Sequence, residues 1–147
     1  MIRGVDASLI YLGLYQGGCP AEHEGTTNIR DAGMAALVLM AGEYQPDASR
    51  FPGVEVLHAP IEDSNVTPEL WEAADRVSDQ VVQRIGREVS VLVTCYEGRN
   101  RSGLVCALVL HKLGYSVEDS IERVRRGRGS RALANPYFTM ALRAGGK

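Results

Sequence analysis

Residues 91–105 read VLVTCYEGRNRSGLV: the end of an apolar run, a short polar loop and the start of a second apolar run. The first run, residues 90–94, has the length and composition of a strand that is covered on both faces. The second, residues 103–113 (GLVCALVLHKL), predicts a helix that is buried nearly all round. In a parallel sheet such a loop lies at the carboxyl end of its strand, where α/β proteins bind ligands.

The rest of the chain repeats this alternation of strand-length runs and helical patterns. The predicted strands are 8–15 (one edge strand or two short ones), 35–40, 54–59 and 90–94, and the predicted helices are 28–33, 67–86, 103–113, 116–126 and 135 onward. Residues 19–27 are expected to form a loop. The sequence therefore predicts a single α/β domain over residues 1–147, with a central, mostly parallel sheet of about four to five strands and helices on both faces.

Composition excludes several classes of protein. The chain has 147 residues, of which 45% are hydrophobic, so it is expected to have one well-formed core and not to be disordered. A net charge of −2 gives no general attraction to nucleic acid or to anionic membranes. No apolar stretch is long enough to span a bilayer, and the first residues lack the apolar run of a signal peptide. We expect a monomer without a membrane span.

The three cysteines indicate a reducing compartment. They are odd in number and contain no CxxC pair, which argues against both a disulfide framework and a zinc site. A reducing environment also preserves a reactive thiol, so we expect a cytoplasmic protein. The histidines, at positions 23, 58 and 111, are scattered without ligand spacing, and no metal or other cofactor is expected.

The loop after residue 94 has the composition of a phosphate-binding cradle. Backbone amides in a tight strand-to-helix turn can point inward at an anion, and Gly98 permits a backbone conformation that a side chain would resist. Arg101 adds a planar fork that matches two phosphoryl oxygens. Cys95, at the base of the cradle and near a helix N-terminus, would be stabilised as a thiolate nucleophile. The alternative, a buried core cysteine in an ordinary turn, explains fewer of these features together.

Residues 91–105 resemble the Cys-x5-Arg-Ser/Thr signature of the protein tyrosine and dual-specificity phosphatase superfamily. The resemblance extends to Ile10-Tyr11-Leu12-Gly13, similar to the family's N-terminal strand signature, and to Pro60-Ile61-Glu62-Asp63, similar to its general-acid loop. Asn135-Pro136-Tyr137-Phe138 is similar to the helix that ends compact members. The position of the motif late in the chain fits the dual-specificity branch.

This resemblance implies a mechanism and a set of site residues. Members hydrolyse phosphotyrosine and, in some branches, phosphoserine or phosphothreonine esters without metal, through a phosphocysteine formed here on Cys95. Asp63, 32 residues before the nucleophile, would be the acid, with Glu62 as its substitute. Ser102 would donate a hydrogen bond to the departing thiolate, or serve only as a helix N-cap. The phosphate-binding residues would be Tyr96, Glu97, Gly98, Arg99, Asn100 and Arg101.

Two sequence features, Thr94 and a cluster of arginines, bear on the expected activity and substrate. Most relatives have histidine before the cysteine, where this chain has Thr94, so we expect retuned or reduced activity. Five arginines lie between residues 123 and 131, and Arg128 would sit beside the site mouth as a second anion site. Otherwise the arginines form a solvated surface.

The arginine cluster leaves the substrate class open. A phosphorylated protein is the expected substrate, and a phosphoinositide or an RNA 5′-phosphate is the alternative. A rhodanese-like sulfurtransferase and a non-catalytic phosphate-binding module are further alternatives. Ser102 and an acid at position 63 argue against the first, and the joint presence of Cys95, Arg101 and Asp63 argues against the second.

Overall fold

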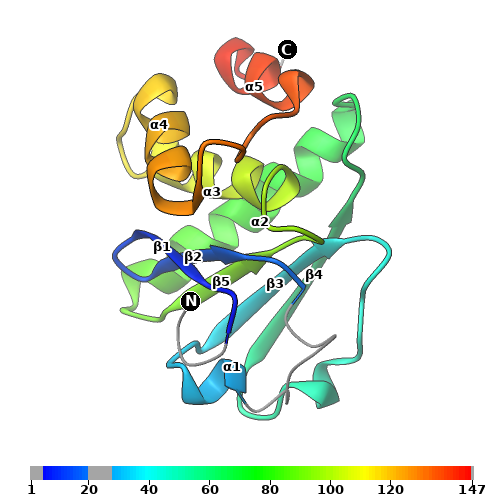
Figure 1. The fold of residues 1–147 in the computed structure, drawn as a ribbon, viewed down its shortest axis with the longest axis vertical. Helices are drawn as coiled ribbons and strands as arrows, with labels where there is room; N and C mark the ends of the chain where they lie inside the picture. Colours follow the sequence, from blue (N-terminus) through cyan, green and yellow to red (C-terminus); the bar gives the residue numbers. More distant parts are fainter. Residues whose placement is uncertain (1–4, 20–27, 147) are drawn as a thin grey trace.

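A five-stranded sheet organises the chain (Figure 1). The computed structural model describes residues 5–19 and 28–146, so most of the predicted 19–27 loop lies outside the described residues. The strands, in the spatial order β1-β2-β5-β3-β4, are β1 (Ser8–Tyr11), β2 (Leu14–Gly17), β3 (Ala36–Ala41), β4 (Glu55–Ile61) and β5 (Val91–Thr94). Only the β1–β2 pair is antiparallel, whereas β2–β5, β5–β3 and β3–β4 are parallel. The predicted four to five mostly parallel strands are confirmed.

Residues 8–15 form the pair of short strands rather than one edge strand. Leu12, which is 84% exposed, and Gly13, with φ of +84°, make the turn between β1 and β2. A positive φ at this position favours glycine. Because β2 also pairs with β5, it lies inside the sheet, and β1 takes the edge. This turn brings β2 beside the strand that leads to Cys95.

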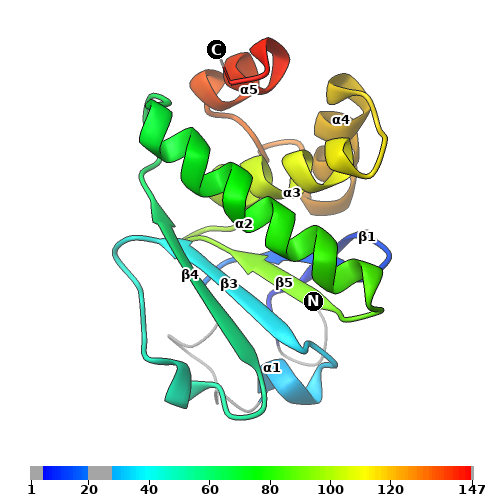
Figure 2. The same cartoon turned by 180° about the vertical axis from the view of Figure 1, so that it is seen from behind.

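Helices cover both faces of the sheet, as predicted, but unequally (Figures 1 and 2). The helices α2 (Pro68–Gly86), α3 (Arg101–Lys112), α4 (Val117–Arg128) and α5 (Pro136–Ala144) lie on one face, and α1 (Asn28–Asp31) lies on the other. A 3₁₀ turn, Ala48–Arg50, precedes β4. Alternate residues of β3 serve the two layers: Val38 belongs to the larger core, whereas Leu37 and Leu39 belong to the smaller one.

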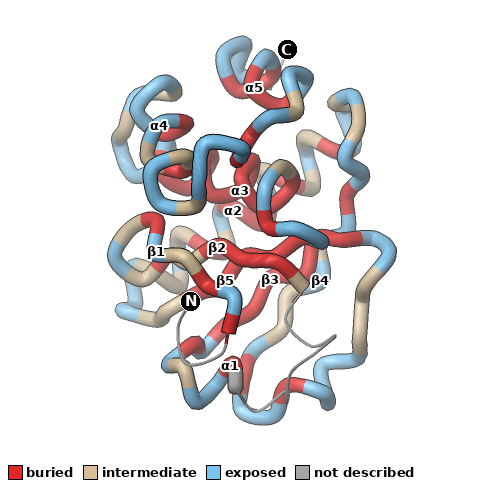
Figure 3. The backbone as a smooth tube through the Cα atoms, in the orientation of Figure 1, coloured by how far each residue is buried: buried red, intermediate tan, exposed pale blue. Residues whose placement is uncertain are grey.

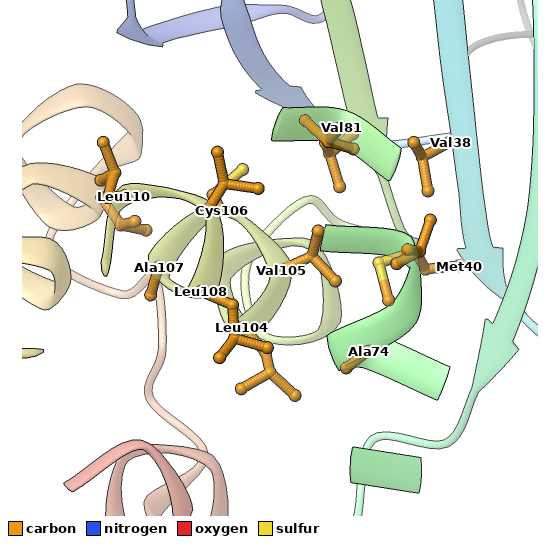
Figure 4. Close-up of a cluster of buried hydrophobic side chains, with 14 of the residues drawn as sticks. Val38, Met40, Ala74, Val81, Leu104, Val105, Cys106, Ala107, Leu108 and Leu110 are labelled. Atoms are coloured by element: carbon orange, nitrogen blue, oxygen red, sulfur yellow. The ribbon is translucent and has the colours of Figure 1, made fainter. Parts of the chain in front are cut away.

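The larger core is centred on α3. Every residue from Arg101 to Leu110 is buried, which accounts for the nearly uniform apolar composition of this helix. Figure 4 shows Val105 of α3 between β3, with Val38 and Met40, and α2, with Ala74 and Val81. Figure 3 shows the same contrast along the chain, with β5, β3 and α3 buried and the outer helices half exposed. Each fully buried aliphatic side chain of this kind contributes about 1.5–3 kcal/mol.

Polar side chains cap the starts of α2, α4 and α5. Thr67 accepts a hydrogen bond from the amide of Leu70, Ser116 from Asp119, and Asn135 from Tyr137. The start of α3 differs from prediction, because the helix begins at Arg101 instead of residue 103. The amide of Leu104 already donates to the carbonyl of Asn100, so the first turn includes two residues that sequence pattern assigned to the loop. Among the described residues, no helix has the length and apolarity needed to cross a membrane.

Candidate active site

The site lies where β5 ends and α3 begins. Cys95 directly follows β5, residues 96–100 form the loop, and Arg101 opens α3. A cavity of about 240 Å³ stands over this loop. It is lined by Glu43, Asp63, Cys95, Tyr96, Glu97, Arg99, Asn100 and Arg101. The predicted nucleophile, cradle, arginine and acid therefore meet in one cavity, although they come from loops at the ends of different strands.

The carbonyl oxygens of the loop point away from its interior. Each accepts a hydrogen bond from outside the loop: Tyr96 from the Cys19 amide, Glu97 and Gly98 from Arg128, Arg99 from the Leu133 amide and Asn100 from the Leu104 amide. The peptide bonds are trans, so the C=O and N–H of one peptide unit point in opposite directions. The amides of residues 97–101 consequently face inward, which is the arrangement that binds an oxyanion.

Glycine is required at position 98 on two grounds. Its φ is +72°, in the left-handed region, and a Cβ there would collide with the backbone carbonyl group of Gly17. The close approach of Gly98 to Gly17 lets the loop lie directly against the end of β2. The conformation that sequence analysis assigned to Gly98 is thus present.

Cys95 lies at the floor of the cavity. The residue is 3% exposed, and its Sγ is 3.2 Å from Oγ of Ser102. Ser102 lies in the first turn of α3, after Arg101, so the alternative interpretation of Ser102 as a helix N-cap is wrong. Its hydroxyl contacts the sulfur and also accepts a hydrogen bond of 3.1 Å from Nε2 of Gln16. The Ser102 hydroxyl thus bridges the sulfur and the Gln16 side chain.

Arg101 is held by Glu43, a residue that the sequence did not single out. Nη1 and Nη2 donate to the two carboxylate oxygens at 2.8 and 3.0 Å, and Nη1 also donates to the carbonyl of Ile61 at 3.3 Å. These hydrogen bonds lower the pKa of Glu43 to about 2 and raise that of Arg101. The ion pair fixes the guanidinium plane from its outer edge.

The inner edge of Arg101 remains available for a ligand. A guanidinium has five N–H donors, and Glu43 and Ile61 use three of them. The Nε–H, which is buried and without a partner among the described residues, and one N–H of Nη2 are left. Both lie on the same edge of the planar group, where they form the fork that matches two phosphoryl oxygens.

Asp63 is positioned by two asparagine side chains. Its Oδ2 accepts from Nδ2 of Asn100 at 3.0 Å, and its Oδ1 accepts from Nδ2 of Asn135 at 2.8 Å. Asn135 also donates to the carbonyl of Ser64, which ties the start of α5 to the acid loop. Each carboxylate oxygen keeps a second lone pair, and Asp63 lines the same cavity as Cys95. Glu62, the predicted substitute, lines a different cavity beside α2.

Thr94 does not direct its hydroxyl at the loop. Oγ1 donates to the carbonyl of Val38 in β3 at 2.7 Å, and the residue is 1% exposed. The one hydroxyl proton of threonine is therefore used within the sheet. The Thr94 hydroxyl is therefore not a donor to Cys95, which it precedes.

Arg128 supports the cradle from behind. Its guanidinium forms an ion pair with Asp6, with Nη1–Oδ1 at 2.6 Å, and donates to the carbonyls of Glu97 and Gly98. The hydrogen bonds with Asp6 raise the pKa of Arg128, and Arg128 in turn holds the pKa of Asp6 below its ordinary value. The side chain is 13% exposed, so most of its surface faces the protein. Its use as a second anion site stays a prediction.

A second cavity, of about 350 Å³, adjoins the first. Its lining residues are Glu97, Arg99, Arg128, Gly129, Ser130, Arg131 and Ala132. Glu97 and Arg99 also line the cavity over Cys95, and they form an ion pair of 3.0 Å with each other. The loop between α4 and α5 thus borders the mouth of the candidate site.

Three contributions to the site could not be recognised in advance. Glu43 and Gln16 contact Arg101 and Ser102 across 58 and 86 residues of sequence, and no local pattern marks either one. Asn135 was recognised as a helix cap within a family-like signature, but its hydrogen bond to Asp63 was not predicted. Within residues 5–19 and 28–146, no group of three or more His, Cys, Asp or Glu could hold a metal ion.

The fold and the site define an α/β protein with a buried thiol that lines a cavity over the loop between β5 and α3. A model of the tyrosine phosphatase family matches residues 59–122. A protein from Dictyostelium discoideum, described as a probable dual specificity protein phosphatase, is 30% identical over 116 residues. This match covers 78% of the present chain, and the chain spans 28% of the length of that relative.

Solved structures give the same result over nearly the whole chain. Tk-PTP in its active form is 26% identical with a TM-score of 0.80, covering 96% of this chain and 95% of that one. A mouse protein described as a putative dual specificity phosphatase, in complex with zinc tungstate, is 27% identical with a TM-score of 0.78, covering 94% of this chain and 84% of that one. Human DUSP28, at 24% identity and a TM-score of 0.77, covers 94% and 90% and shares the fold. The chain is thus similar, over nearly its whole length, to protein tyrosine and dual-specificity phosphatases.

Proposed function

We propose that this chain is a metal-independent phosphatase that hydrolyses phosphotyrosine and phosphoserine or phosphothreonine esters through a phosphocysteine on Cys95. The observation that carries the proposal is the orientation of the loop. Its carbonyls are all bonded outward, so its amides face the inside of the loop, and Arg101, whose Nε–H has no partner among the described residues, lines the same cavity as the sulfur. Donors fixed in this way stabilise the charge that develops on equatorial oxygens during phosphoryl transfer.

In the first step the Cys95 thiolate attacks phosphorus and the bond from phosphorus to the ester oxygen breaks. The departing oxygen takes a proton from the carboxyl group of Asp63, which lines the same cavity as the sulfur. The proposal thus gives Asp63 the role of general acid. Its hydrogen bonds to Asn100 and Asn135 support this role over Glu62, because they direct the carboxylate to the cavity edge.

In the second step a water molecule attacks the phosphocysteine and gives its proton to the Asp63 carboxylate. The sulfur–phosphorus bond breaks, inorganic phosphate leaves, and Cys95 returns to the thiolate. The hydroxyl of Ser102, at 3.2 Å from the sulfur, donates to the thiolate as it departs. Such a thiol requires a reducing environment, and we place the protein in the cytoplasm on this ground.

The cavity supports a permissive choice of phosphoester. Its aromatic lining consists of Tyr96, which is 49% exposed at the rim, so the described walls do not enclose an aryl group on all sides. The tungstate bound by the mouse relative is a tetrahedral oxyanion like phosphate. We infer that a phosphorylated protein segment, with its phosphoryl group in the cradle and its chain outside, is the substrate.

A polyanionic substrate is the second candidate, and the adjoining cavity is the observation that favours it. Arg99 and Arg131 line that cavity and could meet a further phosphate of a phosphoinositide, an RNA 5′ end or a doubly phosphorylated peptide. Arg128 would contribute positive charge from behind the loop and would not contact the further phosphate directly. A sulfurtransferase or a pure binding module is less consistent with Asp63 held at the cavity and Ser102 against the sulfur.

Turnover of p-nitrophenyl phosphate in EDTA tests the proposal. We expect Cys95→Ser to abolish turnover yet bind vanadate, while Cys106→Ala retains turnover because Cys106 is a fully buried core residue of α3. Persistent hydrolysis by Cys95→Ser would exclude this mechanism. Thiosulfate sulfurtransfer without phosphate release would favour the sulfurtransferase alternative.

A further inference from the structure

Gln16 is a buried polar residue behind the cradle. It lies in β2, opposite Val93 of β5, and is 0% exposed. Leu14, two residues earlier on the same strand, belongs to the core beneath α3, so Gln16 faces the same helix. Its Nε2 is 3.1 Å from the carbonyl oxygen of Gly98 and 3.1 Å from Oγ of Ser102. A single amide nitrogen therefore contacts both the loop and the residue beside the nucleophile.

The direction of these hydrogen bonds follows from the chemistry of the partners. A backbone carbonyl can only accept, so the atom that faces Gly98 must be the nitrogen of the Gln16 amide. That nitrogen has two hydrogens, and its two contacts use both of them. The second hydrogen therefore goes to Oγ of Ser102, which acts as an acceptor toward Gln16.

The hydroxyl proton of Ser102 is left for Cys95. Ser102 has one O–H, and its remaining contact is the sulfur of Cys95 at 3.2 Å. We propose that Gln16 is a positioning residue that, through Ser102, directs a hydrogen bond onto the Cys95 sulfur and so favours the thiolate. The inference deepens the proposed function and rests on Cys95 being its nucleophile. It also supplies a donor where Thr94 cannot, since the Thr94 hydroxyl is bonded to Val38.

Other charged groups also face the sulfur. The guanidinium groups of Arg101 and Arg128 lie near it, and Asp63 and Glu43 line the cavity above it. The thiol of Cys106 lies behind it in α3, where burial raises the Cys106 pKa. Among the contacts of the described residues, Arg128 donates to the backbone carbonyl of Gln16 at 3.4 Å, and none of these groups hydrogen-bonds to the Gln16 side chain. A substitution of Gln16 thus removes one neutral donor and leaves the surrounding charges in place.

The positioning role of Gln16 can be tested without preventing folding. Oε1 of Gln16 is buried and without a hydrogen-bond partner among the described residues. A buried polar group without a partner is unfavourable, so an apolar side chain of similar length should be tolerated at this position. The Gly98 carbonyl would still accept from Nε of Arg128. Gln16→Met should therefore fold, with Ser102 free to turn its hydroxyl away from the sulfur.

The test is the rate of iodoacetamide alkylation of Cys95 as a function of pH, followed by mass spectrometry of the peptide that carries it. Gln16→Met should move the midpoint up by about one pH unit, the shift expected for loss of a hydrogen bond to a charged group. Ser102→Ala should move it at least as far. In the Ser102→Ala background, Gln16→Met should add nothing, because both changes break the same chain of hydrogen bonds.

Gln83→Met, an exposed glutamine of α2, is the matched control and should leave the profile unchanged. If Gln16→Met does not fold, Gln16→Leu takes its place. The inference is overturned if the alkylation profile of Gln16→Met superimposes on that of the unsubstituted protein. It is also overturned if Gln16→Met still shifts the profile in the Ser102→Ala background. Turnover by Cys95→Ser would overturn the proposed function instead, so the two failures are distinguishable.

Discussion

The side-chain amide of Asn135 donates a 2.8 Å hydrogen bond to Oδ1 of Asp63 and thereby joins the start of α5 to the loop that carries the candidate acid. The same residue caps α5 by accepting from the amide of Tyr137. Its two functions use opposite ends of one side chain, which makes them separable by substitution.

Asn135→Ser should retain the helix cap and lose the contact with Asp63, because serine caps as well as asparagine but does not reach the carboxylate. We expect turnover of phenyl phosphate, a poor leaving group, to fall by about 100-fold. Turnover of 2,4-dinitrophenyl phosphate, which needs little protonation, should change far less. Asn65→Ser, at an exposed position two residues after Asp63, is the control. Equal losses on both esters would mean that Asn135 does not position the acid.

Asp63→Asn tests the acid itself. The amide cannot give up a proton, so the rate at which phenyl phosphate forms the phosphocysteine should fall by about 10²- to 10⁴-fold, whereas its formation from the activated ester should be nearly unaffected. The plot of log kcat/KM against leaving-group pKa should become steep. Glu62→Gln, which alters the neighbouring carboxylate in a different cavity, should leave that slope unchanged. A slope altered by Glu62→Gln and not by Asp63→Asn would move the acid to position 62.

Glu43→Gln should hold the Arg101 side chain less firmly. It should also make the free energy of unfolding depend less on pH in the acid range. The pKa of Glu43 is lowered to about 2, so the ion pair stabilises the fold above the ordinary value of 4.5 and is lost as pH falls toward 2. Urea unfolding at pH 6 and pH 3 should show a smaller difference for the variant than for the unsubstituted protein. Vanadate affinity should also fall, because the fork is no longer fixed. An unchanged pH dependence of stability would show that the pair contributes little to folding.

Arg131→Ala tests the second cavity. On a doubly phosphorylated peptide, KM should rise by up to about fivefold, the effect of one exposed charge contact, and the rise should vanish at high salt. KM for p-nitrophenyl phosphate should not change. Arg126→Ala, an exposed arginine of α4 paired with Glu122, is the control. A rise in KM for both substrates would place Arg131 outside any second anion site.

Local pattern was sufficient to predict the scaffold. α2 was recognisable from its Thr67-Pro68 start and its buried stripe of Leu70, Ala74, Val77 and Val81, because capping and periodicity depend on near neighbours. The strand before Cys95 and the helix after it were recognisable from run length for the same reason. The boundary of α3 was misplaced by two residues because Arg101 and Ser102 are polar yet buried, and their partners lie elsewhere in the chain.

The supports of the site could not be predicted because they depend on tertiary contacts. Glu43 and Gln16 have no neighbours in sequence that mark them, and only the parallel arrangement of β2, β3 and β5 brings them to the loop. Arg128 was expected beside the site, but its ion pair with Asp6, 122 residues away, and its bonds to two loop carbonyls were not predicted. Sequence identified the groups proposed to react with phosphate, and the structure added the groups that hold them.

The central claim is that the phosphoryl group passes through Cys95. Rapid mixing of Asp63→Asn with 2,4-dinitrophenyl phosphate, followed by acid quenching and mass spectrometry, measures this directly, because the variant lacks the base for the second step. The account predicts one phosphoryl group on the peptide that contains Cys95, formed at the rate of the dinitrophenol burst. A burst with no phosphorylated peptide, or a phosphoryl group on any other residue, would contradict it.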